Sequence, residues 1–486
     1  MGELTLLMAI PALGAILVTL LPQYAVRPVA IIVAAITMLA VWWLLPAFDS
    51  SIATLQFAEM VPWNPRLGTY YALGLDGFSY PMVLLETLLS FIAIVASSSI
   101  RENIKGYYLL MLLLEAAMLG VFMAQDWSLF YLFWELTLVP LFFLIGRWGG
   151  KKRNQASLNF VLYTMGGSIF ILISLLVLFD STPGHSFAMA DMTLGAKSLP
   201  KEAQVWIFLG FLIGFGVKMP IFPLHGWLPL AHVEAPSPVS ILLSGILLKM
   251  GSYGLIRAAT MLPEAIISLQ GILAALALFS LIYGGLLAWR QTDLKMMVAY
   301  SSISHMGIVL LGIAALNAAG LTGAIMQMVS HGFVAGILFL LIGLLYERTG
   351  TRDINHYSSL VQVTPRFAFF TSLAFVGAVG MPGTAGFVAE LHAIIGGFER
   401  WGWSIVIISV GVMISAAYAI RTVGKLLTGP VRPEMQKLKD LNPVEMLSVS
   451  TLAAGIIIIG IFPASILHFI NASVTELSNM FSGYPL

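Results

Sequence analysis

The chain has 486 residues, of which 59% are hydrophobic and only 10% are charged. A soluble domain of this length needs more charge on its surface, so the composition indicates a polytopic membrane protein. The balance of 24 lysines and arginines against 23 acidic residues excludes electrostatic nucleic-acid binding. The absence of cysteine excludes disulfides, thiolate metal sites and iron–sulfur clusters held by this chain, so any redox centre is expected in a partner.

Apolar runs long enough to cross a bilayer follow one another along most of the chain. The first comes directly after Met1 with no charged segment and no small-residue cleavage site, so we expect it to be a retained span. We predict an all-α polytopic protein with a single membrane domain over residues 1–486. The predicted spans are 4–21, 28–46, 77–98, 107–124, 126–147, 157–179, 204–224, 233–258, 265–289, 296–317, 320–346, 366–397, 402–424 and 443–471.

The positive charges outside these spans are distributed unevenly. With fourteen spans, most lysines and arginines fall in the odd-numbered loops. By the positive-inside rule, both termini are then on the non-cytoplasmic side of a cell membrane, either plasma or inner, with a thylakoid-type membrane as an alternative. The two longer polar loops, 47–76 and 180–203, fall on the outer side.

Two predicted spans are interrupted. The span 204–224 breaks at residues 217–220, which read VKMP, and the span 366–397 breaks at residues 379–386, which read VGMPGTAG. Irregular backbone at membrane depth is tolerated only inside protein or beside a water-filled cavity. Paired interrupted helices indicate inverted repeats with an ion site at the bilayer midplane, and the alternative is two unrelated proline kinks.

Six ionisable residues lie well inside predicted spans. Each costs about 2.5–3.5 kcal/mol on insertion scales, so a charged residue at this depth is a functional hypothesis by default. One alone could be structural, but six together indicate a hydrated ion path. They are Glu86, Glu115, Glu135, Lys218, Lys249 and Glu390.

Glu135 is the predicted partner of Lys218. Burial favours a neutral lysine, whereas a nearby carboxylate favours a charged one. If the carboxylate moves closer or further away, the lysine can switch between the two forms, and so load and release a proton.

Four histidines are further candidates. His305 and His331 are flanked by serines and suit a proton relay, although each could instead bridge two helices structurally. His225 and His232 are expected near the outer end of the seventh span, 204–224 (helix seven). They either form part of a path or gate for ions or simply cap the broken helix. Glu115 is a further candidate for such a path or gate. No metal site is predicted, because no histidines and carboxylates stand at ligand spacing.

Five segments resemble the antiporter-like membrane subunits of respiratory complex I, most closely the NADH-quinone oxidoreductase subunit M family. The likeness covers nearly the whole chain, and the choice of subunit depends mainly on Glu390, where longer relatives usually carry lysine. One departure is Leu230, where the family commonly has aspartate, so an entry path near His232 is expected to differ and to use Glu234. The segments are DWSLFYLFWELTLVP (126–140), VKMPIFPLHGWLPLAH (217–232), GILLKMGSYGLIR (245–257), QTDLKMMVAYSSISHMG (291–307) and GMPGTAGFVAE (380–390).

The resemblance implies about fourteen transmembrane helices with two inverted five-helix repeats and broken helices seven and twelve. The repeats are expected at about 107–258 and 265–424, between flanking helices at 1–98 and 443–486. It also implies proton translocation along a set of residues that carry over one by one from the family's motifs. They are Glu135, Lys218, Lys249, His305, His331 and Glu390.

By the same resemblance the chain acts in an enzyme only as a subunit, with no redox site of its own. Flavin, iron–sulfur clusters and quinone are expected in partner subunits, and NADH or ferredoxin as the electron donor. The expected partners are other membrane subunits, including homologous antiporter-like ones, a peripheral redox arm and the lipid bilayer. The motifs also fit the large subunit of a multi-subunit cation/proton antiporter or a membrane-bound hydrogenase. An inert scaffold is a further alternative, and it predicts dispensable buried charges.

Overall fold

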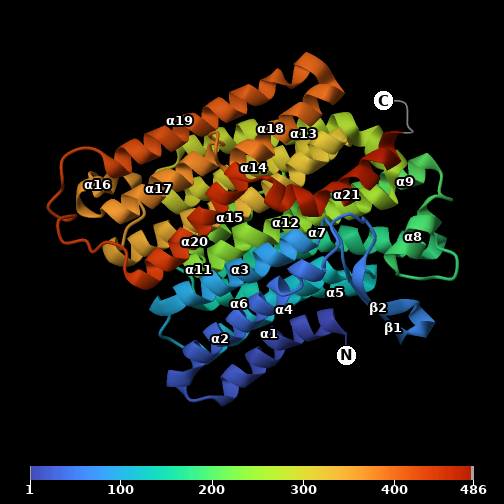
Figure 1. The fold of residues 1–486 in the computed structure, drawn as a ribbon, viewed down its shortest axis with the longest axis horizontal. Coiled ribbons are helices and arrows are strands. Elements are labelled where there is room, and N and C mark those ends of the chain that lie inside the picture. Colours follow the sequence, from blue (N-terminus) through green and yellow to red (C-terminus); the bar gives the residue numbers. More distant parts are fainter. Residues whose placement is uncertain (1, 483–486) are drawn as a thin grey trace.

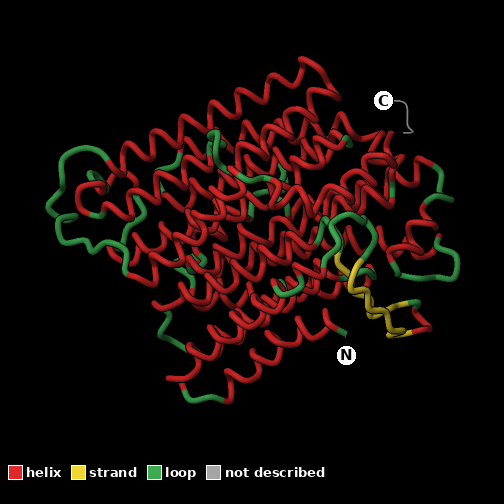
Figure 2. Tube along the Cα trace, in the orientation of Figure 1, coloured by secondary structure: helices red, strands yellow, loops and turns green. Residues whose placement is uncertain are grey.

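The computed structural model describes residues 2–482, and in this part of the chain helices dominate. Most helix axes are roughly aligned with one another, and the connecting loops gather at the two ends of the molecule (Figures 1 and 2). The first twelve are α1 (Glu3–Leu20), α2 (Gln23–Trp42), α3 (Tyr80–Ala96), α4 (Ile104–Met123), α5 (Trp127–Leu136), α6 (Leu138–Trp148), α7 (Arg153–Ser181), α8 (Met189–Ala196), α9 (Lys201–Lys218), α10 (Leu228–Glu234), α11 (Ser237–Leu242) and α12 (Leu248–Met261).

The second half of the chain is also helical. Its helices are α13 (Pro263–Arg290), α14 (Leu294–Ala315), α15 (Ala318–Thr349), α16 (Leu360–Val363), α17 (Pro365–Ala378), α18 (Ala385–Trp401), α19 (Ile408–Leu427), α20 (Pro443–Ile461) and α21 (Ala464–Ser482).

Among the described residues, 12 helical segments are long and apolar enough to cross a membrane. The protein is therefore a helical multi-pass membrane protein. This count leaves out α9, which ends at an internal lysine, and it joins α18 to α19 through the short turn at Gly402–Ile407. The number fourteen and the two repeats stay predictions.

Both predicted breaks are confirmed. In helix seven, α9 ends at Lys218, and Pro220 follows, which has no N–H to continue the helix. In helix twelve, α17 ends at Ala378 and the chain turns through Gly380 and Gly383, whose φ angles are +67° and +92°. These left-handed conformations suit glycine, which has no Cβ.

Three predicted spans are divided where we expected one helix. The span 126–147 consists of α5 and α6, which meet at Thr137. The span 233–258 begins with the end of α10 and contains a π-helical turn at Leu243–Leu247 between α11 and α12. The last span, 443–471, divides at Phe462 into α20 and α21, because the following Pro463 cannot donate a helical hydrogen bond. Period and hydropathy do not register such local interruptions.

The loop 47–76 contains a sheet that the sequence pattern does not predict. Strands β1 (Gln56–Asn64) and β2 (Thr69–Leu75) pair antiparallel, with Met60 opposite Ala72. The turn residue Gly68 accepts a hydrogen bond from the backbone N–H of Phe187 (2.8 Å). The two longer loops therefore meet at one end of the molecule, beside α8 (Figure 1).

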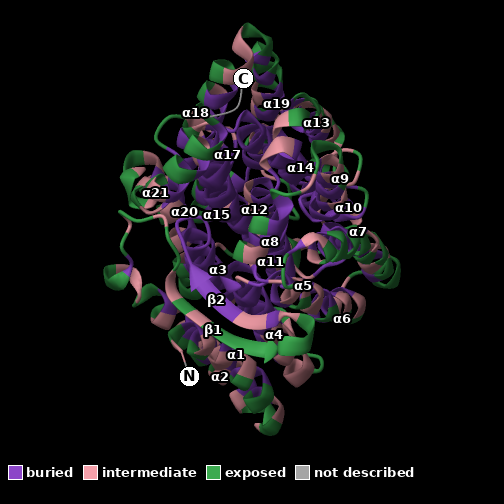
Figure 3. Cartoon of the chain, turned by 90° about the vertical axis from the view of Figure 1, so that its right-hand side faces the viewer, coloured by how far each residue is buried: buried purple, intermediate pink, exposed green. Residues whose placement is uncertain are grey.

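The buried interior is formed by the helices at the centre of the bundle, which appear purple in the end view of Figure 3. The segments Ser237–Met261 and Ala318–Thr349 are the most enclosed, with 100% of the most apolar stretch of each buried, against 39% for α1. Lys249 and His331 belong to these two central segments. Two of the predicted site residues thus lie in the most protected part of the fold.

Candidate functional site: a line of buried charged residues

Lys218 is buried at the interruption of helix seven. As the last residue of α9, it lies at the helix end where unpaired carbonyls carry partial negative charge, which favours a cation. Its Nζ donates a hydrogen bond to Oγ1 of Thr137 (3.0 Å), the residue at which α5 gives way to α6. The same Nζ lies 4.6 Å from the ring centre of Trp134, a cation–π distance.

Glu135 is next to Trp134 on α5, but it does not form an ion pair with Lys218. It is half-buried and lines a pocket between α5, α6 and α7 with Leu132 and Met165. The direct contact of the lysine is with Thr137, and the partnership with Glu135 stays a prediction.

Lys249 is fully buried at the centre of the bundle. Its Nζ donates to the carbonyl of Ser244 in the π-helical turn (2.6 Å) and lies 2.7 Å from Nδ1 of His331 on α15. A π-helical turn leaves carbonyls without their usual partners, which is why Ser244 can accept from a lysine side chain. The two sequence-predicted residues Lys249 and His331 are in direct contact.

His305 on α14 extends this contact toward the second broken helix. The ring centres of His305 and His331 are 5.3 Å apart. Nε2 of His305 donates to the carbonyl of Ala378, the last residue of α17 (3.0 Å). Three predicted residues therefore form a chain from the central lysine to the interruption of helix twelve.

Glu390 is buried on α18, on the other side of that interruption. A Cβ built on Gly380 would lie 2.5 Å from its Oε2, so the carboxyl reaches back against the backbone of the break. Side chains of a helix point toward its N-terminus, where unpaired N–H groups carry partial positive charge. The carboxylate thus lies at the helix end that favours an anion.

The structure corrects the placement of His232. We expected both near the outer end of helix seven, but α10 carries His232 to the opposite end, where the side chain of Glu234 accepts a hydrogen bond from the backbone N–H of Lys152 (2.7 Å). The chain continues in the same direction after its break, so residues that follow the break approach the end of the molecule opposite the loop 180–203. His232 is fully buried and stacks on Phe339, with ring centres 4.5 Å apart.

His225 and the remaining candidates are buried away from the line. His225 packs against Phe222 and Tyr283 in the interruption itself. Glu86 on α3 and Glu115 on α4 are both fully buried. Neither has an ion-pair partner among the described residues.

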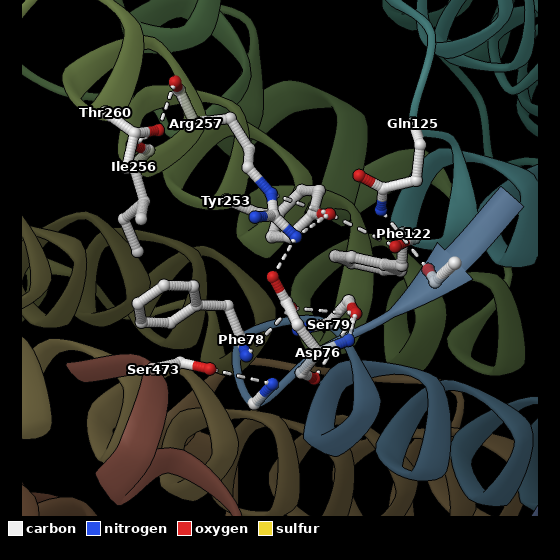
Figure 4. A network of polar contacts seen from close by, with 12 residues as sticks. Asp76, Phe78, Ser79, Phe122, Gln125, Tyr253, Ile256, Arg257, Thr260 and Ser473 are labelled. Carbon is white, nitrogen blue, oxygen red and sulfur yellow. Dashed lines mark hydrogen bonds and ion pairs between the residues drawn. The ribbon is translucent and has the colours of Figure 1, made fainter. Parts of the chain in front are cut away.

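A polar network closes the C-terminal end of α12 (Figure 4). Arg257 of α12 forms an ion pair with Asp76 (2.7 Å) and donates to the hydroxyl of Tyr253 (2.9 Å). Tyr253 in turn donates to the carbonyl of Phe122 (3.1 Å), which ties α12 to α4. Lys249, Tyr253 and Arg257 are four residues apart and share one face of the helix.

Comparison with known proteins identifies the group to which this arrangement belongs. A family model described as NADH:quinone oxidoreductase/Mrp antiporter, TM matches residues 124–415, more than half of the chain. The chain belongs to this family. The matched segment includes all six residues predicted to carry protons, which are Glu135, Lys218, Lys249, His305, His331 and Glu390.

Curated relatives match the chain over nearly its full length. It is 41% identical to the NAD(P)H-quinone oxidoreductase chain 4 2 of Thermosynechococcus vestitus, over 99% of this chain and 92% of the relative. It is 38% identical to the NADH-quinone oxidoreductase subunit M of Rickettsia conorii, over 92% of this chain and 91% of the relative. The resemblance to the subunit M family is thereby confirmed.

Solved structures show the same fold. A chain of respiratory complex I from Thermus thermophilus with bound NADH matches with a TM-score of 0.91 and 31% identity, over 98% of this chain and 99% of that one. A chain of the Mrp complex from Dietzia sp. matches with a TM-score of 0.85 and 21% identity, over 98% of this chain and 55% of that one. At this identity the second match shows the fold alone.

Sequence reasoning missed the groups that hold the charged residues in place. Thr137, Trp134 and Ser244 are the direct contacts of the two lysines, and Asp76 pairs with Arg257. A hydroxyl group inside an apolar run was a signal for Thr137, whereas the Ser244 contact is made by its backbone carbonyl, which no side chain announces. The pairing of Asp76 had no signal, because it joins the ends of two helices distant in sequence.

Proposed function

We propose that this chain is a proton-translocating, antiporter-like membrane subunit of an NADH-quinone oxidoreductase, which couples electron transfer in partner subunits to proton pumping. The observation that carries this proposal is the match over nearly the full length of relatives named as subunits of such enzymes. The contact between Lys249 and His331 at the centre of the fold supports the proton-transfer part.

In the proposed path, a proton enters near Glu135 and is taken up by Lys218. It moves through Lys249 and the histidines His331 and His305, and it leaves by way of Glu390. Water bridges the steps between groups that do not touch. Histidine can accept a proton on one ring nitrogen and release one from the other, which suits the segment between Lys249 and Ala378.

Three further residues have proposed roles beside this path. Glu115, His225 and His232 act as a path or gate. His232 now belongs to the inner side, because it lies at the end of α10 that contacts the loop before α7. Both ring nitrogens of His232 lack a hydrogen-bond partner in the described part of the chain, so they can bind water.

The proposal also assigns partners and a location. Flavin, iron–sulfur clusters and quinone are held by other subunits, and electrons come from NADH or ferredoxin. The neighbours are homologous antiporter-like membrane subunits and a peripheral redox arm, all in or on a cell membrane. Both termini face the non-cytoplasmic side, and the end of the molecule with the α6–α7 loop, which contains Lys151 and Lys152, faces the cytoplasm.

Purification from the native membrane in mild detergent tests this function. Every protein that co-purifies with the chain is identified, and the flavin and iron–sulfur content is measured. We expect flavin and iron–sulfur subunits with an NADH- or ferredoxin-binding partner. Small hydrophobic partners without any redox protein would contradict the proposal and support a cation/proton antiporter instead.

A further inference from the structure

Two buried carboxyl groups lie beside the line of charged residues. Glu86 is on α3 and Glu115 is on α4, the next helix along the chain, and both are 0% exposed. Helices α3 and α4 pack against each other as an antiparallel pair. At 1.5 Å per residue, Glu86 is about 9 Å from the start of α3 and Glu115 about 12 Å from the end of α4, so both lie at a similar depth from the same end.

The pair lacks the partners that buried carboxylates need. Ser90 donates a hydrogen bond to one oxygen of Glu86 (2.8 Å), but within residues 2–482 the other oxygen of Glu86 and both oxygens of Glu115 have no hydrogen-bond partner. Glu86 is also the charged neighbour of Glu115, so the two carboxyls interact electrostatically. Other ionisable groups lie on α4 itself and on neighbouring helices, and none of them hydrogen-bonds or ion-pairs with either carboxyl: Tyr107, Tyr108, Lys249, Tyr253, Arg257 and His331.

This arrangement favours bound protons over a bound metal ion. Two buried carboxylates without a cation cannot both stay ionised, because each pays desolvation and repels the other. A protonated carboxyl can donate its O–H to the second one, which satisfies two of the unpartnered oxygens. A hard metal cation needs about six or more oxygen ligands, and two carboxyls with one hydroxyl supply too few.

The pair is placed to sense the central lysine. Leu85 and Leu89, which precede and follow Glu86 in the sequence, pack where Gly245 and Gly332 approach each other. A Cβ on Gly245 would lie 2.5 Å from Leu89, and one on Gly332 would lie 2.5 Å from Leu85. These two glycines directly follow Ser244 and His331, the two contacts of Lys249. Helix α3 therefore rests on the backbone that holds the lysine.

We propose that Glu86 and Glu115 form a proton-storage site next to the central lysine: the pair always keeps at least one proton and exchanges a second as the charge on Lys249 changes. Storage follows from the two carboxyls alone, whereas its use in pumping rests on the proposed function. The site lies on α3 and α4, outside the segment 124–415 that the family model matches.

Infrared spectroscopy of the intact purified complex tests the storage. The carboxylic acid C=O band is compared in H2O and D2O for the parental complex, Glu86→Gln, Glu115→Gln and the double variant. Glu202→Gln, on the exposed first turn of α9, is the matched control. We expect the double variant to lose band intensity that the control keeps, and each single variant to lose part of it. The single variants are isosteric and carry the test if the double variant does not assemble.

Three results would overturn the proposal. The first is a double or single variant whose band equals that of the control, and the second is a band that disappears when sodium is added, since this would make the pair a cation site. The third is a lost band with unchanged proton pumping, because the stored proton would then be static.

We expect pumping in the single variants to fall about fivefold, the low end of coupling between sites. A parental complex that shows the band but pumps no protons would contradict the proposed function and leave the storage intact.

Discussion

The two interrupted helices place opposite charges at opposite kinds of helix end. Lys218 closes α9, where the carbonyl end of the helix dipole favours a cation, whereas Glu390 reaches back toward the start of α18, where the N–H end favours an anion. Each break therefore provides, inside the membrane, the partial charge that suits its own ionisable residue. The favourable positions for Lys218 and Glu390 therefore depend on where the two helices are interrupted.

The surroundings of the two charges differ. Lys218 is held by side chains of a neighbouring helix, the Thr137 hydroxyl and the Trp134 ring. Glu390 lies against bare backbone at Gly380, where no side chain fits. Side-chain replacements should therefore disturb the first site most, and a glycine replacement should disturb the second.

Replacing Lys218 should have the largest effect. Lys218→Met keeps the volume and removes the charge, so the complex should assemble while proton pumping falls about a hundredfold, as for loss of a group that transfers protons. Pumping is measured by dye quenching in membrane vesicles, with assembly checked on native gels. Lys201→Met, on the exposed first turn of the same helix, is the control and should pump normally. An assembled Lys218→Met complex that pumps like this control would contradict the role of the lysine.

A methyl group at Gly380 should disturb the second site. Gly380→Ala forces a Cβ against the Glu390 carboxyl in a left-handed conformation, at a cost of about 1–3 kcal/mol, and pumping should fall about tenfold. Gly383→Ala is the matched control, because Gly383 also has a positive φ but has nothing within 4 Å of the added Cβ. Equal pumping losses in the two variants would show that backbone strain alone is responsible, and not the displaced carboxyl.

Removing the hydroxyl that accepts from Lys218 should have a smaller effect. Thr137→Val preserves shape and deletes one hydrogen bond to a charged group, and pumping should fall about fivefold. Thr137→Ser keeps the hydroxyl and should pump at nearly the parental rate. If valine and serine behave alike, the contact with Thr137 does not matter for the lysine.

The smallest effect is expected at Asp126, which caps α5 ahead of Thr137. Its side chain accepts from the backbone N–H groups of Leu129 (3.0 Å) and Tyr70 (3.1 Å), and burial raises its pKa although these hydrogen bonds oppose the shift. Asp126→Ala should destabilise the protein by about 1–2 kcal/mol, seen as a lower melting temperature, with unchanged pumping per assembled complex. Asp126→Ser retains a cap and should recover most of the stability. A pumping defect without a stability loss would mean that Asp126 belongs to the path.

Much of this comparison could be predicted from the sequence, and the limits have physical causes. Charged residues and prolines inside apolar runs predicted Lys218, Lys249, Glu390 and both breaks, because each is costly in a membrane unless function requires it. The predicted end of the molecule for His232 was wrong, because the chain can continue in the same direction after a helix break. The contact between Lys249 and the Ser244 carbonyl depends on a π-helical turn, which leaves no mark on hydropathy.

The most direct test of the account is proton uptake by liposomes that contain the purified complex, measured together with electron transfer. The parental complex is compared with Lys249→Met, which removes the charge at the centre of the line. We expect the parental complex to take up protons only during electron transfer, and the variant to lose nearly all of this uptake. An assembled variant with parental proton uptake would contradict the claim that protons pass through this chain.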